Sequence, residues 1–364
     1  MCKRILASQT NTEEGIPFYK IGTIGNAPDA YISKELFDDY KTKYNYPHKG
    51  EVMITCAGTV GKCVIYDGKD AYYQDSNIVW IDNPSQHINN GFLYHLLANV
   101  NWRKLNSTTI IRIYNDDLRN LKLSYPQIEE QKKISRLLSL LDERIATQNK
   151  IIDKLQSLIK GLNDTLYAQH SDEVMTSFAE LGTSYSGLSG KSAQDFGSGK
   201  PFITYLNVYS NNIINKNDFQ YVAIKDGEEQ NIVEYGDVLF TLSSETPNEV
   251  GIGSVFLGKE KVYLNSFCFG IHITNKEVAF SPYLSYYVSS TAFRKFIYPY
   301  AQGSTRFNLC KADFEKASIK LPTLENQKRI YSILSHIDNK IITERQMLDL
   351  YNSQKQYLLR QMFI

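Results

Sequence analysis

The chain has 364 residues, of which 42% are hydrophobic and 22% are charged, as in an ordinary folded protein rather than a disordered or fibrous one. The 40 Lys and Arg residues nearly balance the 39 Asp and Glu residues. The net charge of +1 therefore lacks the basic excess that phosphate contacts usually leave in a nucleic-acid-binding protein.

Residues 1–125 are predicted to form a strand-rich first domain. Short β-branched and aromatic runs at 52–55 and 78–81 predict strands, and residues 92–99 predict a short helix. A long helix is predicted over 126–170, because apolar residues recur there every three or four positions. That stripe consists of Leu138, Leu141, Ile145, Ile152, Leu155, Ile159, Leu162 and Leu166.

The same order of elements returns in the second half. Residues 171–321 are predicted to form a second domain, with strands at 238–241 and 267–271 and a short helix at 282–289. A second long helix is predicted over 322–364. Its apolar stripe consists of Leu334, Ile337, Ile341, Leu348, Tyr351, Leu358 and Met362.

The two halves are an internal repeat. With an offset of 196 residues, 126–145 and 322–341 align without a gap and share nine identities in twenty positions. Upstream, Gly50-Glu51-Val52 matches Gly236-Asp237-Val238, and Tyr73-Gln74-Asp75-Ser76 matches Tyr263-Leu264-Asn265-Ser266. The repeat predicts two similar domains, each followed by a helix.

Both long helices carry apolar residues at a seven-residue spacing over four heptads, which favours coiled-coil pairing. We expect the two helices to pair with each other, since neither could bury its stripe alone. The alternative, in which each helix packs on its own domain, stays open. A helix of about 40 residues is about 60 Å long and would be a rigid spacer.

The repeated helix start Pro-x-[Ile/Leu]-Glu-x-Gln-Lys-x-Ile stands at Pro126 and again at Pro322, and blocks 15–22 and 73–77 precede the first copy. This pattern resembles the specificity subunit of type I restriction-modification systems over nearly the whole chain. The resemblance implies an α/β (α+β) fold class with two target recognition domains, each reading one part of a split DNA site in the major groove. It also implies that the two helices form an antiparallel coiled coil that sets the gap between the half-sites.

The resemblance further implies the partners. They are double-stranded DNA, two methyltransferase subunits docked on the helices, and restriction-translocase subunits. The chain would direct methylation and cleavage by these subunits, which use S-adenosylmethionine, ATP and magnesium, while binding no cofactor itself. Two alternatives stay open: a specificity subunit of a type II-like or phage-defence methylation complex, and a coiled-coil scaffold with degenerate recognition domains.

One segment departs from the repeat. Residues 172–184 precede Phe202 in the second half, whereas their counterpart in the first half would lie before Met1. The sequence therefore predicts a first domain that is shortened at its N-terminus.

Base edges in DNA are read by Arg, Asn, Gln and short polar side chains, which we expect on loops between strands. The first-domain candidates are Lys20, Thr55, Thr59, Lys62, Gln74, Asp75, Asn77, Arg112, Tyr114 and Asn115. The second-domain candidates are Tyr205, Asn207, Thr241, Ser243, Ser244, Glu245, Asn265, Arg306 and Asn308. Arg112 and Arg306 are the strongest, because both follow a Ser/Thr-rich stretch, although the alignment of their loops is open by two residues. A solvent-exposed or ion-paired arginine, and turn chemistry for Gln74, Asp75 and Asn77, are the alternatives.

We expect no catalytic and no metal-binding residues. The stretch Asn115-Asp116-Asp117-Leu118 lacks the prolines of a DNA methyltransferase motif, and the six histidines show no metal-ligand spacing. The five cysteines have no CxxC spacing, which argues against a disulfide framework or a zinc site. No apolar run approaches the ~18 residues of a membrane span, so we expect a cytoplasmic protein.

Overall fold

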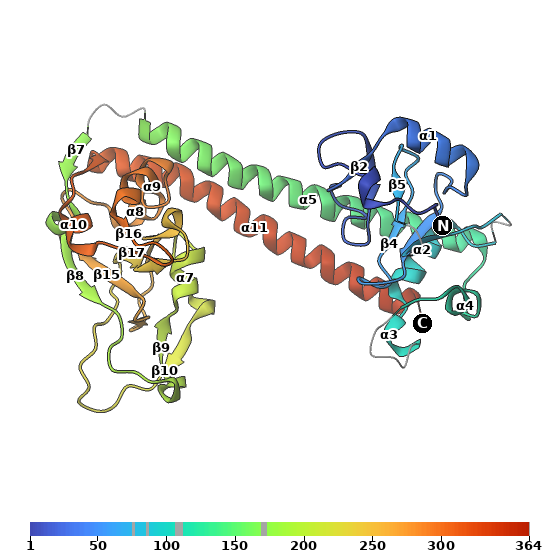
Figure 1. Ribbon diagram of the computed structural model, residues 1–364. Helices are drawn as coiled ribbons and strands as arrows, with labels where there is room; N and C mark the ends of the chain where they lie inside the picture. The colour runs from blue at the N-terminus through green and yellow to red at the C-terminus, as the bar shows by residue number, and fades with distance from the viewer. Residues whose placement is uncertain (75–76, 85–86, 106–111, 169–172, 364) are drawn as a thin grey trace. The chain divides into compact units, whose positions relative to one another are not determined.

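The computed structural model describes the chain except for residues 75–76, 85–86, 106–111, 169–172 and 364. The chain forms two compact units. The first unit combines Met1–Asn149 with Gln346–Ile364, and the second is Lys150–Arg345. Two long helices, α5 (Ile128–Ala168) and α11 (Leu324–Met362), each contribute one part to each unit (Figure 1).

The first unit contains two small sheets, with strand orders β2-β1-β5 and β4-β3-β6. The strands are β1 (Ile16–Tyr19), β2 (Tyr31–Ile32), β3 (Val52–Thr55), β4 (Cys63–Ile65), β5 (Tyr72–Tyr73) and β6 (Ile78–Ile81). The helices besides α5 and α11 are η1 (Ala7–Gln9), α1 (Lys34–Lys43), α2 (Asn90–Asn99), α3 (Trp102–Leu105) and α4 (Asn115–Arg119).

The second unit has sheets with orders β10-β9-β14, β13-β11-β15-β8, β12-β17-β16 and β18-β7. Its strands are β7 (Glu173–Thr176), β8 (Gly182–Ser186), β9 (Phe196–Ile203), β10 (Gln220–Val222), β11 (Val238–Thr241), β12 (Ser243–Ser244), β13 (Gly253–Val255), β14 (Tyr263–Leu264), β15 (Cys268–Ile273), β16 (Ala301–Gln302), β17 (Phe307–Leu309) and β18 (Ile319–Pro322). Its short helices are α6 (Phe178–Leu181), η2 (Ala193–Asp195), α7 (Tyr205–Ser210), η3 (Lys216–Asp218), η4 (Pro247–Glu249), α8 (Ser281–Tyr287), α9 (Thr291–Ile297), η5 (Tyr298–Tyr300) and α10 (Lys311–Lys316).

The central strands β3 and β11 explain why their sequences are continuously apolar. Successive side chains of a strand point to opposite faces, and a strand covered on both faces is apolar throughout. In β11, Val238 and Phe240 pack into one hydrophobic cluster, whereas Leu239 packs into another. In β3, Met53 likewise faces a different cluster from Ile54. Each unit therefore has a sheet buried between two layers of apolar side chains.

Hydrogen bonds confirm that the units are built from one repeated fold. The Oγ1 atom of Thr55 accepts from the Lys62 N–H at 3.0 Å, and the Oγ1 atom of Thr241 accepts from the Ile252 N–H at 3.0 Å. The strand orders β4-β3-β6 and β13-β11-β15 correspond. The second unit adds β8 beside β15, and this strand comes from the segment that precedes Phe202.

The repeated glutamine of the helix-start motif fastens each long helix to its domain. The Nε2 atom of Gln327 donates to the carbonyls of Val278 and Pro322 at 2.7 and 2.8 Å, and its Oε1 atom accepts from the Phe280 N–H at 2.8 Å. Gln131 makes the equivalent three bonds, to His87, Pro126 and Asn89. Both glutamines are buried. The motif is therefore conserved between the repeats because it orients the helix.

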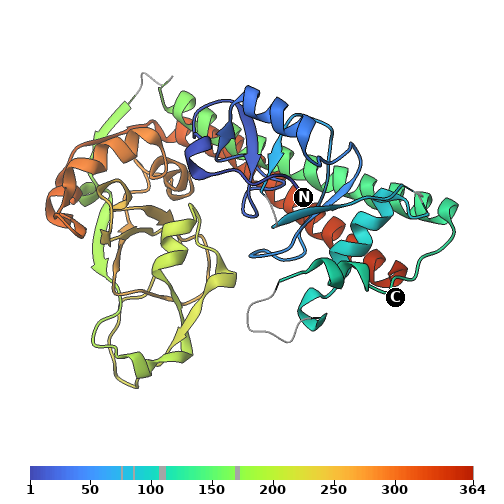
Figure 2. The same cartoon turned by 45° about the vertical axis from the view of Figure 1, so that its right-hand side comes forward.

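Contacts within each unit show that α5 and α11 are antiparallel. In the first unit, Lys355 near the end of α11 pairs with Asp142 of α5, and Arg144 lies over the Tyr351 ring. In the second unit, Leu162 near the end of α5 packs into the cluster that contains Leu334 of α11. Figures 1 and 2 show the two helices side by side within each unit.

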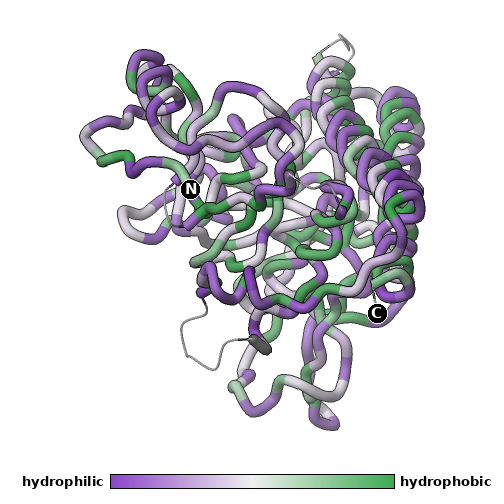
Figure 3. The backbone as a smooth tube through the Cα atoms, turned by 90° about the vertical axis from the view of Figure 1, so that its right-hand side faces the viewer, coloured by the Kyte–Doolittle hydropathy of each residue, from purple (hydrophilic) through white to green (hydrophobic). Residues whose placement is uncertain are grey.

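The seam of the helix pair follows the predicted heptads. Leu138, Leu141, Ile152, Leu334 and Ile341 are buried. Figure 3 shows apolar and polar segments alternating along the helices, as a single apolar stripe requires. The pairing of the helices is thus confirmed, and the alternative also holds in part, since Leu334 belongs to the second unit's own core.

Candidate nucleic-acid interface

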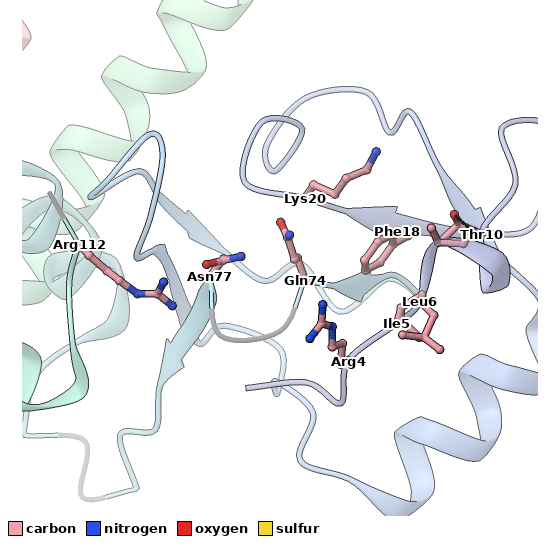
Figure 4. A pocket seen from close by; sticks show the side chains of 10 residues that line it. Arg4, Ile5, Leu6, Thr10, Phe18, Lys20, Gln74, Asn77 and Arg112 are labelled. Atoms are coloured by element: carbon pink, nitrogen blue, oxygen red, sulfur yellow. Dashed lines mark hydrogen bonds between the residues drawn. The ribbon is translucent and has the colours of Figure 1, made fainter. Parts of the chain in front are cut away.

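Four of the predicted residues of the first unit line one cavity of about 420 Å³ (Figure 4). They are Lys20, Gln74, Asn77 and Arg112. The guanidinium of Arg4 enters the same cavity from the N-terminal segment. The cavity thus combines three cationic side chains with two amides, which suits a polar, negatively charged ligand with hydrogen-bonding edges.

Backbone hydrogen bonds hold the loops that carry these side chains. The N–H of Gln74 donates to the Tyr19 carbonyl at 2.9 Å, which continues the parallel pairing of β5 with β1. The carbonyl of Asn77 accepts from the Cys56 N–H at 2.8 Å, and the Ile113 N–H donates to the Cys56 carbonyl at 2.9 Å. Asn77 and the segment that carries Arg112 are therefore both bonded to Cys56 at the end of β3, although they are far apart in sequence.

Gln74 and Lys20 are engaged by neighbouring groups of the fold. The Oε1 atom of Gln74 accepts from the Ile21 N–H at 3.2 Å, so its Nε2 atom is the end that can donate to a ligand. The ammonium of Lys20 pairs with Asp29 at 3.0 Å, and both side chains are exposed to solvent. An exposed pair of this kind is weak and can open for a phosphate.

Arg4 was not predicted from the sequence. It stands in a segment without strand or helix periodicity, and nothing local indicates that this segment returns to the end of β5. The only signal was its charge next to Lys3.

In the second unit, Ser243 connects three of the predicted residues. Its Oγ atom accepts from Arg306 Nη2 at 3.2 Å, and its carbonyl accepts from the Tyr205 hydroxyl at 2.8 Å. Ser243 also pairs with Asn308 in the β12–β17 ladder. Burial raises the pKa of Tyr205, so its hydroxyl remains a neutral donor. Arg306 and Asn308 are exposed and face solvent from this framework.

The structure corrects the prediction for three residues, because their side chains are at most 2% exposed and are bonded inside the fold. Thr55 and Thr241 fix the turn that follows β3 and β11, respectively, through the Oγ1 bonds described above. Asn207 is 2% exposed, and its amide bonds both the N–H and the carbonyl of Asn215. These residues shape loops and cannot touch a ligand in this conformation.

The remaining predicted residues have several placements. Ser244 is buried and donates to Glu249 at 3.2 Å, whereas the neighbouring Glu245 is exposed. Thr59 and Lys62 lie in the turn between β3 and β4, outside the lining of the cavity. Tyr114 and Asn115 stand on the surface at the start of α4, and Asn265 follows β14. Asp75 lies outside the described residues.

Hydrogen bonds also fix the alignment of the two repeats, which the sequence left open. The N–H groups of Ile113 and Leu309 bond the strand-end carbonyls of Cys56 and Leu242, so Arg112 is equivalent to Asn308 and not to Arg306. The N–H of Asn265 bonds the Ile203 carbonyl as that of Gln74 bonds Tyr19. Asn265 is therefore equivalent to Gln74, which corrects the predicted match with Asp75.

In the part of the chain that the structure describes, no group of three or more His, Cys, Asp or Glu side chains is arranged to hold a metal ion. Within the same residues, no helix is both long enough and apolar enough to span a bilayer.

Comparison with known proteins gives a consistent result. The family described as Type I restriction modification DNA specificity domain matches residues 1–157 and 185–350. A type I restriction enzyme specificity subunit from Haemophilus influenzae is 49% identical over 160 residues, which are 44% of this chain and 41% of that protein. The MjaX specificity subunit from Methanocaldococcus jannaschii is 24% identical over 379 residues, covering 94% of this chain and 84% of that one.

A similar fold occurs among solved structures. The S subunit of a type I restriction-modification system from M. genitalium aligns with a TM-score of 0.58 at 15% identity. The alignment covers 100% of this chain and 92% of that chain. At this identity the likeness establishes the shared fold of two repeated domains and two long helices.

Proposed function

This chain belongs to the type I restriction modification DNA specificity domain family, and from this premise we propose that it recognises a two-part DNA site on behalf of a type I restriction-modification complex. The observation that carries the proposal is the convergence of Arg4, Gln74, Asn77 and Arg112 on one cavity. Arginine and amide side chains are among the groups that read base edges in the major groove.

The second unit carries a candidate surface that would read the other half-site of the DNA. Its candidate surface is built from Tyr205, Arg306 and Asn308 around Ser243. Because Arg112 and Arg306 stand at inequivalent positions of the repeat, the two units present different side-chain patterns to DNA. We therefore expect two half-sites of different sequence, separated by bases that the chain does not read.

The methyltransferase partners would dock on the long helices. Leu137 and Ile333 are equivalent in the repeat, and both are exposed apolar residues; the same is true of Ile151 and Met347. Exposed apolar stripes on otherwise polar helices are typical of protein interfaces. Two equivalent stripes fit two copies of one partner. Because this chain has a net charge of only +1, the partner subunits would also supply many of the contacts to DNA phosphates.

Catalysis in this proposal belongs to the partners. Methyltransferase subunits would use S-adenosylmethionine, and translocase subunits would use ATP and magnesium. This chain supplies the sequence readout and the scaffold.

The recognition role is tested by base-resolution mapping of methylated adenine in the source genome, with and without the gene for this chain. A split motif that disappears on deletion supports the proposal. If the two genomes carry identical methylation, the chain does not direct methylation there.

Docking is tested by native mass spectrometry of the chain with its methyltransferase subunit. The replacement Ile333→Asp places a charge in the exposed apolar stripe of α11. We expect the complex then to lose one of its two methyltransferase copies. Ser332→Asp, at an exposed neighbouring position, is the control and should retain both. If Ile333→Asp also retains both copies, the stripe is not the docking surface.

A further inference from the structure

In both units an arginine guanidinium lies over an exposed aromatic ring. The Cζ atom of Arg112 is 5.9 Å from the centre of the Tyr114 ring, and that of Arg306 is 5.9 Å from the centre of the Phe267 ring. Tyr114 is 60% exposed and Phe267 is 56% exposed, so neither ring serves a hydrophobic core. Their common feature is the arginine that each ring supports.

A ring beneath a guanidinium restricts where the arginine can point. Cation–π attraction holds the planar group near the ring face, while its N–H donors remain at the edges. Arg306 is restrained further, since its Nη2 atom donates to Ser243 Oγ at 3.2 Å. A side chain ordered before binding loses less entropy when it forms two parallel hydrogen bonds.

A guanidinium held in this way favours guanine among the bases. In the major groove, guanine presents two adjacent acceptors, O6 and N7, which match two guanidinium donors. Adenine places an N6 amino donor where guanine has O6, so it would repel one of the two arginine donors.

The neighbouring residues favour a base edge over a phosphate. Arg112 shares its cavity with the amides of Gln74 and Asn77. Asn308 follows Arg306 along the chain in β17. Asn265 lies two residues before Phe267, whose ring lies beneath Arg306, and the Oδ1 atom of Asn265 accepts from the Phe267 backbone N–H at 2.9 Å. Amide side chains beside an arginine form a set that distinguishes bases, whereas phosphate contacts carry no sequence information.

We propose that Arg112 and Arg306 each read a guanine, so that each half-site of the DNA contains a G·C pair that its arginine specifies. Tyr114 and Phe267 are positioning residues for these two arginines. The inference rests on the proposed function. Since Arg112 directly precedes the anchored Ile113, whereas Arg306 stands three residues before the anchored Leu309, the guanines occupy different places in the two half-sites.

The test compares the methylated motif, read from genomic DNA, for the wild-type chain and for Arg112→Ala and Arg306→Ala in the assembled complex. We expect a G in each half of the wild-type motif. Each variant should lose the preference for one G in one half-site only, by roughly 5- to 150-fold, and leave the other half unchanged.

Two ring variants separate positioning from bulk packing. Phe267→Leu keeps an apolar side chain without a π face, and Phe267→Tyr keeps the face. We expect the leucine variant to weaken the preference for G at the position that Arg306 reads, and the tyrosine variant to preserve it. Equal behaviour of the two variants would overturn the positioning role.

A split motif that lacks G in one half, or that is unchanged by the arginine variants, overturns the guanine assignment and leaves the recognition function intact. Uniform weakening of binding for all sequences would instead identify a phosphate contact, if the slope of log affinity against log salt concentration also falls by about one. That result would likewise overturn the guanine assignment. A wild-type complex without any motif overturns the recognition function itself.

Discussion

Replacement of Gln327 by alanine should weaken the attachment of the start of α11 to the second unit. The side chain is fully buried, and it makes three hydrogen bonds, to Val278, Phe280 and Pro322, each 2.7–2.8 Å long. A typical hydrogen bond contributes about 1 kcal/mol net, and each buried group left without a partner adds a cost of about 1–3 kcal/mol. Water entering the vacated space would offset part of this cost. We therefore expect the free energy of unfolding to fall by about 3–5 kcal/mol.

Urea unfolding followed by circular dichroism measures this loss, and hydrogen exchange locates it. The exchange of the Phe280 amide should accelerate in Gln327→Ala, because this N–H loses its acceptor. Gln356→Ala, at an exposed position of the same helix, is the matched control and should change stability by less than about 0.5 kcal/mol. If Gln327→Ala is as stable as the control and the Phe280 amide stays protected, the three bonds of Gln327 do not hold α11 on the second unit.

Two further outcomes concern buried polar groups. Burial lowers the pKa of His95 to about 4, below its ordinary value of 6.5, so the unfolded chain binds the proton more readily. Stability should therefore decrease as the pH falls from 6.5 towards 4, by up to about 3 kcal/mol, and His95→Phe should flatten this part of a denaturation series against pH. Tyr185→Phe removes the hydroxyl that donates to buried Asp237 at 2.7 Å, and should lower the free energy of unfolding by about 1.5–3 kcal/mol in urea titrations. Tyr221→Phe, at an exposed position, is its control, and equal stability of the two variants would contradict the role of the bond.

The repeat and the helix pair could be predicted because their signals are periodic. A heptad stripe such as Leu138, Leu141 and Ile152 is created by the same geometry that buries it. The buried strands β3 and β11 were visible as apolar runs for a similar reason, since both of their faces are covered.

The site was predicted less completely, because polar residues at strand ends have two opposite uses. Thr55 and Thr241 follow apolar strands and resemble loop residues that meet a ligand, but their hydroxyls fix the next turn instead. Sequence alone does not distinguish these uses, because the deciding partner is a backbone N–H several residues away.

The alignment of Asn265 with Asp75, which the structure corrects to Gln74, has a related origin. The adjacent Tyr72 and Tyr73 offered two ways to match Tyr263, and only the pairing of β5 with β1 shows that Tyr72 is its equivalent. The resulting one-residue shift changed which side chain was compared with Asn265. Arg4 was missed because non-periodic chain gives no indication of where it returns.

The recognition of two half-sites at one spacing is tested most directly by selection from a randomised duplex library. The chain, assembled with its methyltransferase subunits, is incubated with the library, and the bound fraction is sequenced. Two enriched blocks of different sequence, separated by a single length of unselected bases, are expected from two unlike domains joined by paired helices. One continuous block, variable spacing between blocks, or no enrichment would contradict this assignment.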